Sequence, residues 1–449
     1  MHAGVSITAI AGSLAWVRSA IDDEVPRRDD SNRSFHSLFP DAHLIAGAEA
    51  SVTMRYAYIK SGNVVEELRR FGPAPQNVAP GGPETFSGTF LQRICGSPAL
   101  LVSLLRGVPT DERLNLGSVE ALSFRCDNML MEAYVAARIF MRLIAFRPQI
   151  VICVRDGWTL WAAFLACRLT RARFVHSRQR AILVPGDSWR RRLTAKIDGF
   201  VIRRAVAIVC HGPFTHQQLT SIGVLDSRIV EFDILLDDVL SEMRQASNTA
   251  RIPVDGQRLR IFFLGRIEAS KGVFDLFEAC IPILNARADV DLVYVGGGRA
   301  TSALQQTVHK AGLSSRVEFA GRIPHSQIGV RLKSATVLVA PTRHGLEGWP
   351  MVGLEGQAIG LPIIGPAAGP FPFMIRDGID GLLFDVNSVT DLRRKIELAL
   401  DDSDLRRRLS LGALATADRR AKSLRSFGEA LDEVLARVSD RGNFDSPAT

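Results

Sequence analysis

The sequence predicts an α/β protein with two domains, each built on a largely parallel sheet. Short apolar segments of strand composition alternate with helical segments over residues 149–232 and again over 258–438. This alternation is typical of parallel sheets covered by helices on both faces. The 449-residue chain is long enough for two such cores, and the polar stretch 237–256 is typical of a linker. We expect a poorly defined N-terminal segment (1–40), a first domain (41–245), a second domain (246–438) and a tail (439–449).

Composition indicates a folded protein with an anionic partner. Hydrophobic residues make up 47% and charged residues 23% of the chain, as in globular proteins. The net charge of +8 favours a nucleotide, a nucleic acid or an acidic membrane surface as partner. The six cysteines lack C-x-x-C or metal-ligand spacing, so we expect reduced, buried thiols, no metal site and a cytoplasmic protein. Ile7 to Val17 is apolar, but no Lys or Arg precedes it, so we do not expect a signal peptide.

In the first domain, hydrophobic periodicity and residue composition predict the helices, strands and loops up to residue 146. The density of Pro and Gly in 73–88 predicts a loop there, and the one-sided apolar pattern of Met129 to Phe146 predicts a helix. The other expected elements are strands at 43–46, 55–59 and 119–125, a helix at 64–71 and a strand or helix at 96–106.

A βαβ unit follows, with strands at 149–154 and 173–176 and a helix at 159–169. His176 ends the second strand, which in an open parallel sheet is the ligand-facing edge. It is therefore a candidate functional residue, although a polar residue at the end of a strand can also be purely structural.

Ser188 to Arg204 combines six cations with apolar residues at roughly helical spacing. This pattern fits a helix that contacts an anionic membrane, and it fits equally a solvated helix that covers the domain core. Both interpretations remain open. A strand at 205–210, a short helix to 222 and a strand at 228–232 complete the domain.

The second domain opens with a strand at 258–264 and the loop Gly265 to Gly272. Arg266 and Lys271 lie in this loop, at the edge of the sheet where ligands bind, and a guanidinium and an ammonium group suit phosphate oxygens. They could also be solvated loop cations. A helix follows from 273, which Pro282 should kink or divide. The later strand at 291–295 leads into a triple glycine. The strand at 317–319 leads into Gly321-Arg322-Ile323-Pro324, and Arg322 and Ile323 are further candidates for ligand binding.

The segment from Ala340 to Ile364 joins a strand to a loop and a helix, and it carries Glu347 and Glu355. Pro350 suits the first turn of that helix, which should end at Gly360. A strand, a polar loop and a helix N-terminus together form an anion-binding crevice in open α/β sheets. A strand at 362–365, a turn at 369–372, a strand within 375–385 and helices from 389, 404 and 423 should follow.

Four motifs in this order resemble the GT-B retaining glycosyltransferases of family 4, which are related to glycogen synthase. They are GRIEASKG at 265–272, EGWPMVGLE at 347–355, GLPII at 360–364 and DGIDGLLFD at 377–385. The resemblance implies two Rossmann-like domains that face each other across a cleft. It also implies a metal-independent, cofactor-free hexosyltransferase that moves a sugar from a nucleotide-diphosphate donor to a saccharide or lipid-linked acceptor. Such enzymes act in polysaccharide or glycolipid biosynthesis, here with the inner face of the plasma membrane as an expected location.

The resemblance also implies roles for single residues. Arg266 and Lys271 would neutralise the donor diphosphate, Glu347 would lie near the donor sugar, and Glu355 would bind the ribose. His176 would lie near the C6 side of the sugar. The remaining candidates for donor binding are Gly265, Arg322, Ile323 and the backbone of Trp349, Pro350, Met351 and Val352. Thr342, His344 and Phe373 depart from the family pattern, so the donor sugar is left open.

Three other interpretations are compatible with parts of the sequence. Asp289-Val290-Asp291 spells the metal motif of a different glycosyltransferase fold, but it leads into a strand. A sugar-nucleotide epimerase could share the architecture, and a non-catalytic protein could bind a nucleotide sugar without turning it over. Nucleic-acid binding is not expected, because basic residues are not interleaved with stacking aromatics.

Overall fold

The computed structural model describes residues 54–71, 83–94, 96–105, 110–179, 181–182, 188–233, 258–343, 348–423 and 425–439. The N-terminal segment 1–40, the strand predicted at 43–46, the linker predicted at 237–256 and Glu347 lie outside these ranges. Among the described residues, no helix is long and apolar enough to cross a membrane.

In the described part of the chain, eight strands form the first sheet, in the order β3-β4-β2-β1-β5-β6-β7-β8. Every neighbouring pair is parallel except β3 and β4, which form an antiparallel hairpin. The strands are β1 (Tyr56–Ser61), β2 (Ala99–Leu105), β3 (Glu112–Leu116), β4 (Val119–Arg125), β5 (Ile150–Cys153), β6 (Arg173–Arg178), β7 (Ala207–His211) and β8 (Ile229–Phe232).

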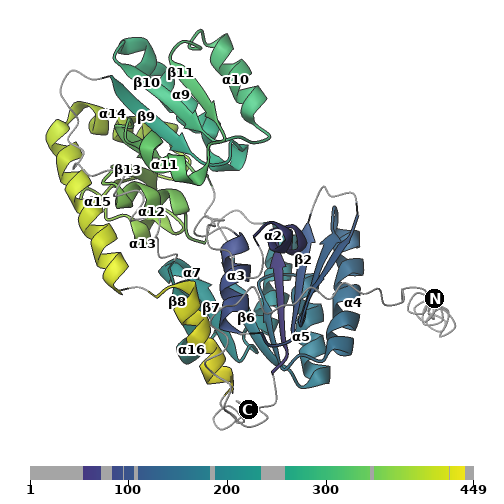
Figure 1. Ribbon diagram of the computed structural model, residues 1–449. Coiled ribbons are helices and arrows are strands. Elements are labelled where there is room, and N and C mark those ends of the chain that lie inside the picture. Colours follow the sequence, from purple (N-terminus) through teal and green to yellow (C-terminus); the bar gives the residue numbers. More distant parts are fainter. Residues whose placement is uncertain are drawn as a thin grey trace, which may run out of the picture. The chain divides into compact units, whose positions relative to one another are not determined.

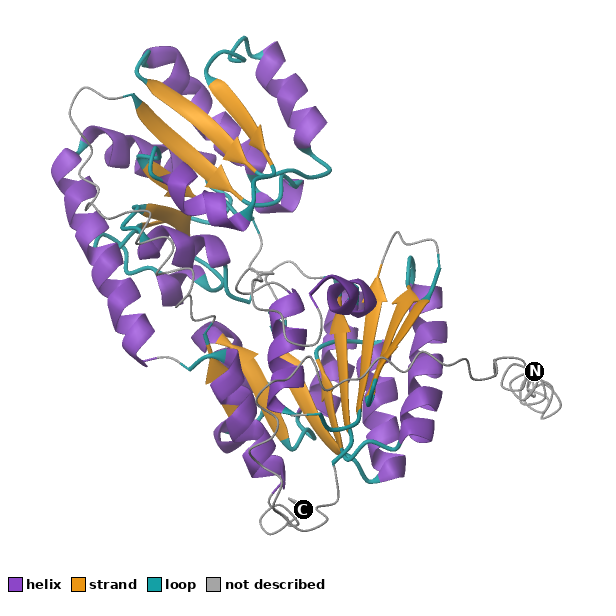
Figure 2. Cartoon of the chain, viewed as in Figure 1, coloured by secondary structure: helices purple, strands orange, loops and turns teal. Residues whose placement is uncertain are grey.

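Helices cover both faces of this sheet, as Figures 1 and 2 show. One apolar core takes buried residues from α4 (Met129–Phe146), α5 (Trp158–Thr170), α6 (Trp189–Ile202) and α7 (Gly212–Ser221). The core on the other face takes them from α2 (Val64–Phe71), α3 (Pro83–Arg93) and α16 (Phe427–Ser439). The described cysteines Cys126, Cys153, Cys167, Cys210 and Cys280 are buried and free, as predicted.

The second sheet has six parallel strands in the order β11-β10-β9-β12-β13-β14. They are β9 (Leu259–Leu264), β10 (Val290–Val295), β11 (Val317–Gly321), β12 (Val337–Val339), β13 (Ile363–Pro366) and β14 (Leu382–Phe384). The helices that pack on it are α9 (Val273–Ala286), α10 (Thr301–Lys310), α11 (His325–Leu332), α12 (Met351–Ala358), α13 (Phe371–Met374), α14 (Val389–Asp401) and α15 (Ser403–Ser423). The predicted α/β architecture with two parallel-sheet domains is confirmed.

The last helix packs on the first sheet rather than on the second. The ring of Phe427 in α16 meets the rings of Phe86 and Phe232 edge to face, with centroids 4.7 and 5.2 Å apart. We expected the whole of 246–438 in the second domain, whereas residues 427–439 contribute to the first core because their apolar face fits beside α3, β7 and β8.

The structure differs from the sequence prediction at four places. The loop predicted over 73–88 gives way to α3 at Pro83, since proline is tolerated in the first turn of a helix. The short edge strand β3 was not predicted, because its half-exposed residues become regular only by pairing with β4. The turn predicted at 369–372 continues into the one-turn helix α13. Pro282 lies within α9 and does not divide it.

Candidate functional site

The loops after β9, β10 and β12 meet at the carboxyl edge of the second sheet, and glycines allow the contact. A Cβ at Gly272, where φ is +68°, would lie 1.8 Å from the carbonyl oxygen of Pro341. A Cβ at Gly296, where φ is +133°, would lie 1.9 Å from the carbonyl oxygen of Gly265. Residues other than glycine rarely adopt such backbone φ values, and their side chains would not fit at these positions. The three loops therefore touch backbone to backbone.

Arg266 and Lys271 occupy the first of these loops, as the sequence predicts. Lys271 ends a single 3₁₀ turn, Ala269–Lys271, directly before α9. Burial, reinforced by the charge of Arg266, lowers the pKa of Lys271 to about 8, and Glu268 opposes the shift. The side chain of Arg266 is 69% exposed and donates a hydrogen bond to Oε1 of Glu268 at 2.9 Å. The loop thus holds a solvated cation beside a half-buried one.

An ion pair that the sequence did not predict joins the first turn of α9 to the loop after β12. The guanidinium of Arg343 binds both carboxylate oxygens of Asp275, in the first turn of α9. The backbone N–H of Arg343 also donates to the carbonyl oxygen of Ser270 at 3.3 Å. The sequence offered one clue, because Arg343 lies in the segment already singled out and Asp275 lies four residues after Lys271.

Helix α12 begins and ends close to where the sequence predicts. Pro350 is its N-cap residue, Met351 and Val352 open its first turn, and Gly360 lies just beyond its end with φ of +65°. Glu355 lies within the helix and is only 5% exposed. Its carboxylate is therefore largely shielded from solvent, which is uncommon for glutamate.

Trp349 directly precedes this helix and is buried. The guanidinium carbon of Arg420 lies 5.0 Å from the centre of a Trp349 ring. Arg420 also donates to Oε1 of Gln357 in α12, at 3.0 Å, and burial lowers its pKa. A residue from α15 therefore contacts both the residue before the N-cap of α12 and the last turn of that helix, and no sequence pattern pointed to it.

Arg322 and Ile323 follow β11, the neighbour of β10. The side chain of Arg322 passes over the triple glycine: a Cβ at Gly297 would lie 3.4 Å from Cγ of Arg322. The structure thus brings Arg322 to the same edge of the sheet as Gly265, Arg266 and Lys271.

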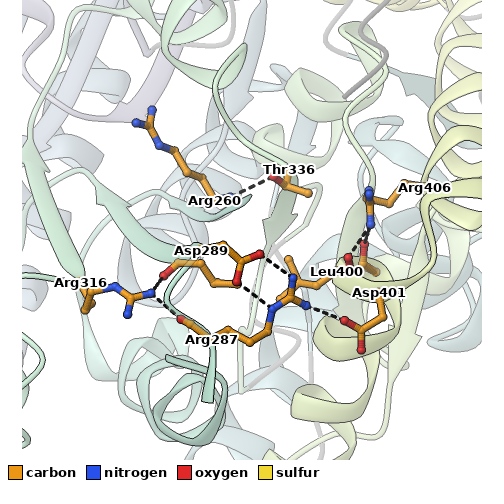
Figure 3. Close-up of polar contacts among 10 residues, drawn as sticks. Arg260, Arg287, Asp289, Arg316, Thr336, Leu400, Asp401 and Arg406 are labelled. Atoms are coloured by element: carbon orange, nitrogen blue, oxygen red, sulfur yellow. Dashed lines mark hydrogen bonds and ion pairs between the residues drawn. The ribbon is translucent and has the colours of Figure 1, made fainter. Parts of the chain in front are cut away.

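The two carboxylates of the D-x-D sequence lie at the start of β10, and each contacts arginine. Asp289 binds Arg287, which also binds Asp401 (Figure 3). Asp291 binds Arg258 and Arg316. These arginines hold the pKa of both carboxyl groups below their usual range. The pair therefore supports the amino-terminal end of the sheet, away from the loops that carry the predicted site.

A cavity of about 480 Å³ lies at the carboxyl ends of β1, β5 and β6 in the first sheet. Charged and hydroxyl-bearing side chains dominate its wall, with a few apolar residues between them. The described lining residues are Tyr58, Lys60, Ser61, Phe86, Glu132, Val154, Arg155, Asp156, Gly157, Arg178, Gln179, Thr194 and Asp198.

Ion pairs and hydrogen bonds fix the polar groups of this cavity. Arg155 donates to Oε1 of Glu132 and to Oγ of Ser61, both at 3.1 Å, and Arg178 binds Asp156. Asp198 accepts a 2.8 Å hydrogen bond from Nε1 of Trp161. Burial, and next the charge of Asp156, raises the pKa of Asp198 to about 6. None of these residues was singled out from the sequence, because they come together from separate strand ends and from α6.

His176 does not line this cavity. It is fully buried in β6, two residues before Arg178, which does line the cavity. Burial lowers the pKa of His176 to about 4, so its ring is neutral at pH 7. Its expected contact with a donor sugar remains a prediction.

Two family models match the chain. The model described as "Glycosyl transferases group 1" matches residues 245–414, and the model described as "Glycosyl transferase 4-like domain" matches residues 62–232. A D-inositol 3-phosphate glycosyltransferase of Mycobacterium sp. (strain JLS) is 28% identical over 260 residues, which is 56% of this chain and 56% of that protein. The chain spans about half the length of the curated relatives it matches.

Solved structures of other proteins share the fold, and HepE and sucrose-phosphate synthase are two of them. HepE of Anabaena, crystallised in complex with UDP, has a TM-score of 0.60 and 15% identity, over 85% of this chain and 100% of that one. Sucrose-phosphate synthase from Thermosynechococcus elongatus has a TM-score of 0.60 and 17% identity, over 85% and 98%. Both likenesses extend over the two parallel-sheet domains.

Proposed function

The chain belongs to the glycosyltransferases of group 1, and we propose that it transfers a hexose-type sugar from a nucleotide-diphosphate donor to a saccharide or lipid-linked acceptor. The observation that carries the proposal is the loop after β9, which holds Arg266 and the half-buried Lys271 at the carboxyl edge of the second sheet. Phosphate oxygens are the ligands that such a pair of cations fits. The UDP complex of the structurally similar HepE supports a nucleotide donor.

In this proposal the two cations stabilise the diphosphate as it leaves the sugar, which is where negative charge develops. Their charge removes the need for a metal ion. Glu355 accepts hydrogen bonds from the ribose hydroxyls, and Glu347 and His176 serve the donor sugar. The backbone N–H groups of Trp349, Met351 and Val352, at the start of α12, face phosphate or sugar oxygens.

We further propose that the acceptor hydroxyl attacks the sugar on the face from which the diphosphate departs. The bond between the anomeric carbon and the phosphate oxygen breaks, a bond from that carbon to the acceptor oxygen forms, and the acceptor proton passes to the departing phosphate. The anomeric configuration is then retained. The cavity on the first sheet, with its carboxylates and guanidinium groups, suits the hydroxyls of the acceptor.

The proposed setting is polysaccharide or glycolipid biosynthesis in the cytoplasm, with peripheral membrane contact through Ser188 to Arg204. The alternatives are an epimerase-like enzyme and a non-catalytic binding protein. Product analysis separates all three, since a transferase needs an acceptor, an epimerase does not, and a binding protein leaves the donor unchanged.

A thermal-shift screen with UDP, GDP and ADP tests the donor class, because a ligand at 100 times its Kd adds about 2.7 kcal/mol to the free energy of unfolding. We expect one of the three to stabilise the protein. With that donor, Lys271→Ala should abolish transfer, whereas Glu355→Ala should mainly weaken nucleotide binding. Unchanged turnover in the Lys271→Ala protein would refute the proposed role of the loop, and an inverted product, seen by NMR of the anomeric proton, would refute retention.

A further inference from the structure

Helix α6 turns a row of large apolar side chains toward solvent. Trp189, Leu193, Ile197 and Phe200 are 69%, 52%, 42% and 47% exposed. Their spacing of four, four and three residues places them on one side of the helix. The core side of the same helix is formed by other residues, among them the buried Val201 and Ile202.

Helix α5, which packs against α6, extends this apolar surface. Trp158, Leu165 and Leu169 are 46%, 52% and 64% exposed, again at helical spacing. The hydrogen bond from Trp161 to Asp198 ties the two helices together. We call the seven exposed residues the α5–α6 face: Trp158, Leu165, Leu169, Trp189, Leu193, Ile197 and Phe200. An apolar surface that spans two helices is uncommon in a monomeric protein and marks an interaction site.

The exposed charges of α5 and α6 themselves have a single sign. Exposed cations lie on the same two helices or directly after their ends, at Arg168, Arg171, Arg191, Arg192, Lys196, Arg203 and Arg204. Over residues 158–171 and 188–204 the sequence contains one acidic residue, Asp198, which is buried. The guanidinium carbon of Arg204 lies 3.5 Å from the ring centre of Phe200, so cationic and aromatic groups lie side by side at the surface.

We propose that the α5–α6 face docks on the surface of an anionic lipid bilayer. Tryptophan and leucine side chains enter the boundary between headgroups and acyl chains, while flanking Lys and Arg bind anionic headgroups. A solvated helix face does not account for the seven exposed apolar side chains. A protein partner would also account for them, but the cations carried by the same two helices complement a membrane of negative charge.

The opposite side of α6 lines the cavity of the first sheet, through Thr194 and Asp198. A helix with its side chains is about 10–12 Å across, so a docked α6 holds that cavity about one helix diameter from the lipid surface. This conclusion rests on the proposed function, in which the cavity binds the acceptor. The acceptor is then a sugar that a lipid anchors in the bilayer.

Flotation of the full-length protein with vesicles tests the docking. We expect binding to phosphatidylcholine vesicles that contain about 30% phosphatidylglycerol, little binding to pure phosphatidylcholine, and weaker binding at high salt. The variant Leu193→Gln/Ile197→Gln should lose at least about tenfold in partitioning, because two apolar side chains no longer enter the lipid. The matched control is Ile379→Gln/Leu411→Gln, which changes residues 52% and 58% exposed in the second domain and should bind vesicles like the wild type.

Thermal unfolding with and without the nucleotide tests the donor site independently of membrane docking. Both double variants should keep the nucleotide-induced shift, since neither changes the loop after β9. Equal flotation of both variants, or no flotation of the wild-type chain, would overturn the docking and leave the transferase proposal intact. A wild-type mass that is twice that of the Leu193→Gln/Ile197→Gln protein by light scattering would also overturn it, because the face would then bind a second copy.

Discussion

Lys271 combines a positive charge with a half-buried position, and the combination has a measurable consequence. Its pKa of about 8 lies more than two units below that of a lysine in water. A bound diphosphate would favour the protonated form and raise the pKa again. Nucleotide binding should therefore take up a proton at alkaline pH.

We predict that nucleotide affinity falls as pH rises through 8. The free protein is protonated at Lys271 below that pH and neutral above it, so the affinity should drop about tenfold between pH 7 and pH 9. Isothermal titration calorimetry in buffers of different ionisation heat measures both the affinity and the proton uptake. Lys271→Arg is the control, since arginine stays protonated throughout and should remove the dependence. An equal pH dependence in both proteins would contradict this role of Lys271.

A second prediction concerns His176. Its pKa in the folded protein is about 4 against an ordinary value of 6.5, so the unfolded chain takes up the proton first as pH falls. The neutral His176 therefore contributes its full share to the free energy of unfolding above pH 6.5. This contribution, about 3 kcal/mol, is lost as the pH falls from 6.5 through 4. Urea unfolding at pH 7.5 and 4.5 should show a loss in the wild type that is about 2–3 kcal/mol larger than in His176→Gln. A loss of the same size in both proteins would contradict the buried, neutral histidine.

At the scale of elements, three loops reach one edge of the second sheet only because glycines let their backbones touch. The prediction is that Gly272→Ala weakens nucleotide binding at least about tenfold, since a Cβ there would meet the carbonyl oxygen of Pro341 and displace the loop of Lys271. Gly312→Ala is the matched control: its φ of +71° imposes similar strain, but nothing lies within 4 Å. Equal affinities in the two variants would show that contact between the loops does not position the site.

Much of the element pattern could be predicted from the sequence. A buried strand with continuous apolar composition, such as β5, and a one-sided helix such as α4 have local signals strong enough to locate them. Arg266 and Lys271 could be named because the residues after a parallel strand lie at the ligand edge whatever the rest of the fold does. The strand β3 could not, because its structure depends on pairing with β4.

The cavity on the first sheet shows why part of the site could not be predicted. Arg155, Arg178 and Asp198 come from two strand ends and a helix that are neighbours only in the folded sheet. Their sequence contexts resemble ordinary loop and surface positions. The strand order that brings them together is a property of the tertiary structure, and so are the ion pairs that orient them.

At the scale of the whole molecule, the chain returns to its first sheet at its last helix. The residues of α16 turn buried apolar side chains toward α3, β7 and β8. The sequence shows an amphipathic helix over these residues but does not say which sheet it covers, since an apolar stripe fits either one.

We predict that Leu431→Ala destabilises the protein by about 2–5 kcal/mol, because Leu431 is fully buried in α16 and its truncation leaves a cavity. Leu411→Ala removes the same group from a side chain that is 58% exposed and should change the free energy of unfolding by about 0.5 kcal/mol or less. Urea unfolding followed by circular dichroism compares the two. A similar small effect of both would mean that α16 does not pack on the first core.

The central claim is that the loop after β9 binds the diphosphate of a nucleotide donor. Calorimetric affinities for a nucleoside diphosphate and for its parent nucleoside, in the wild type and in Lys271→Ala, test it most directly. We predict that the wild type prefers the diphosphate at least about a hundredfold and that Lys271→Ala loses most of this preference while its affinity for the nucleoside is unchanged. A Lys271→Ala protein that keeps the full preference would contradict the account.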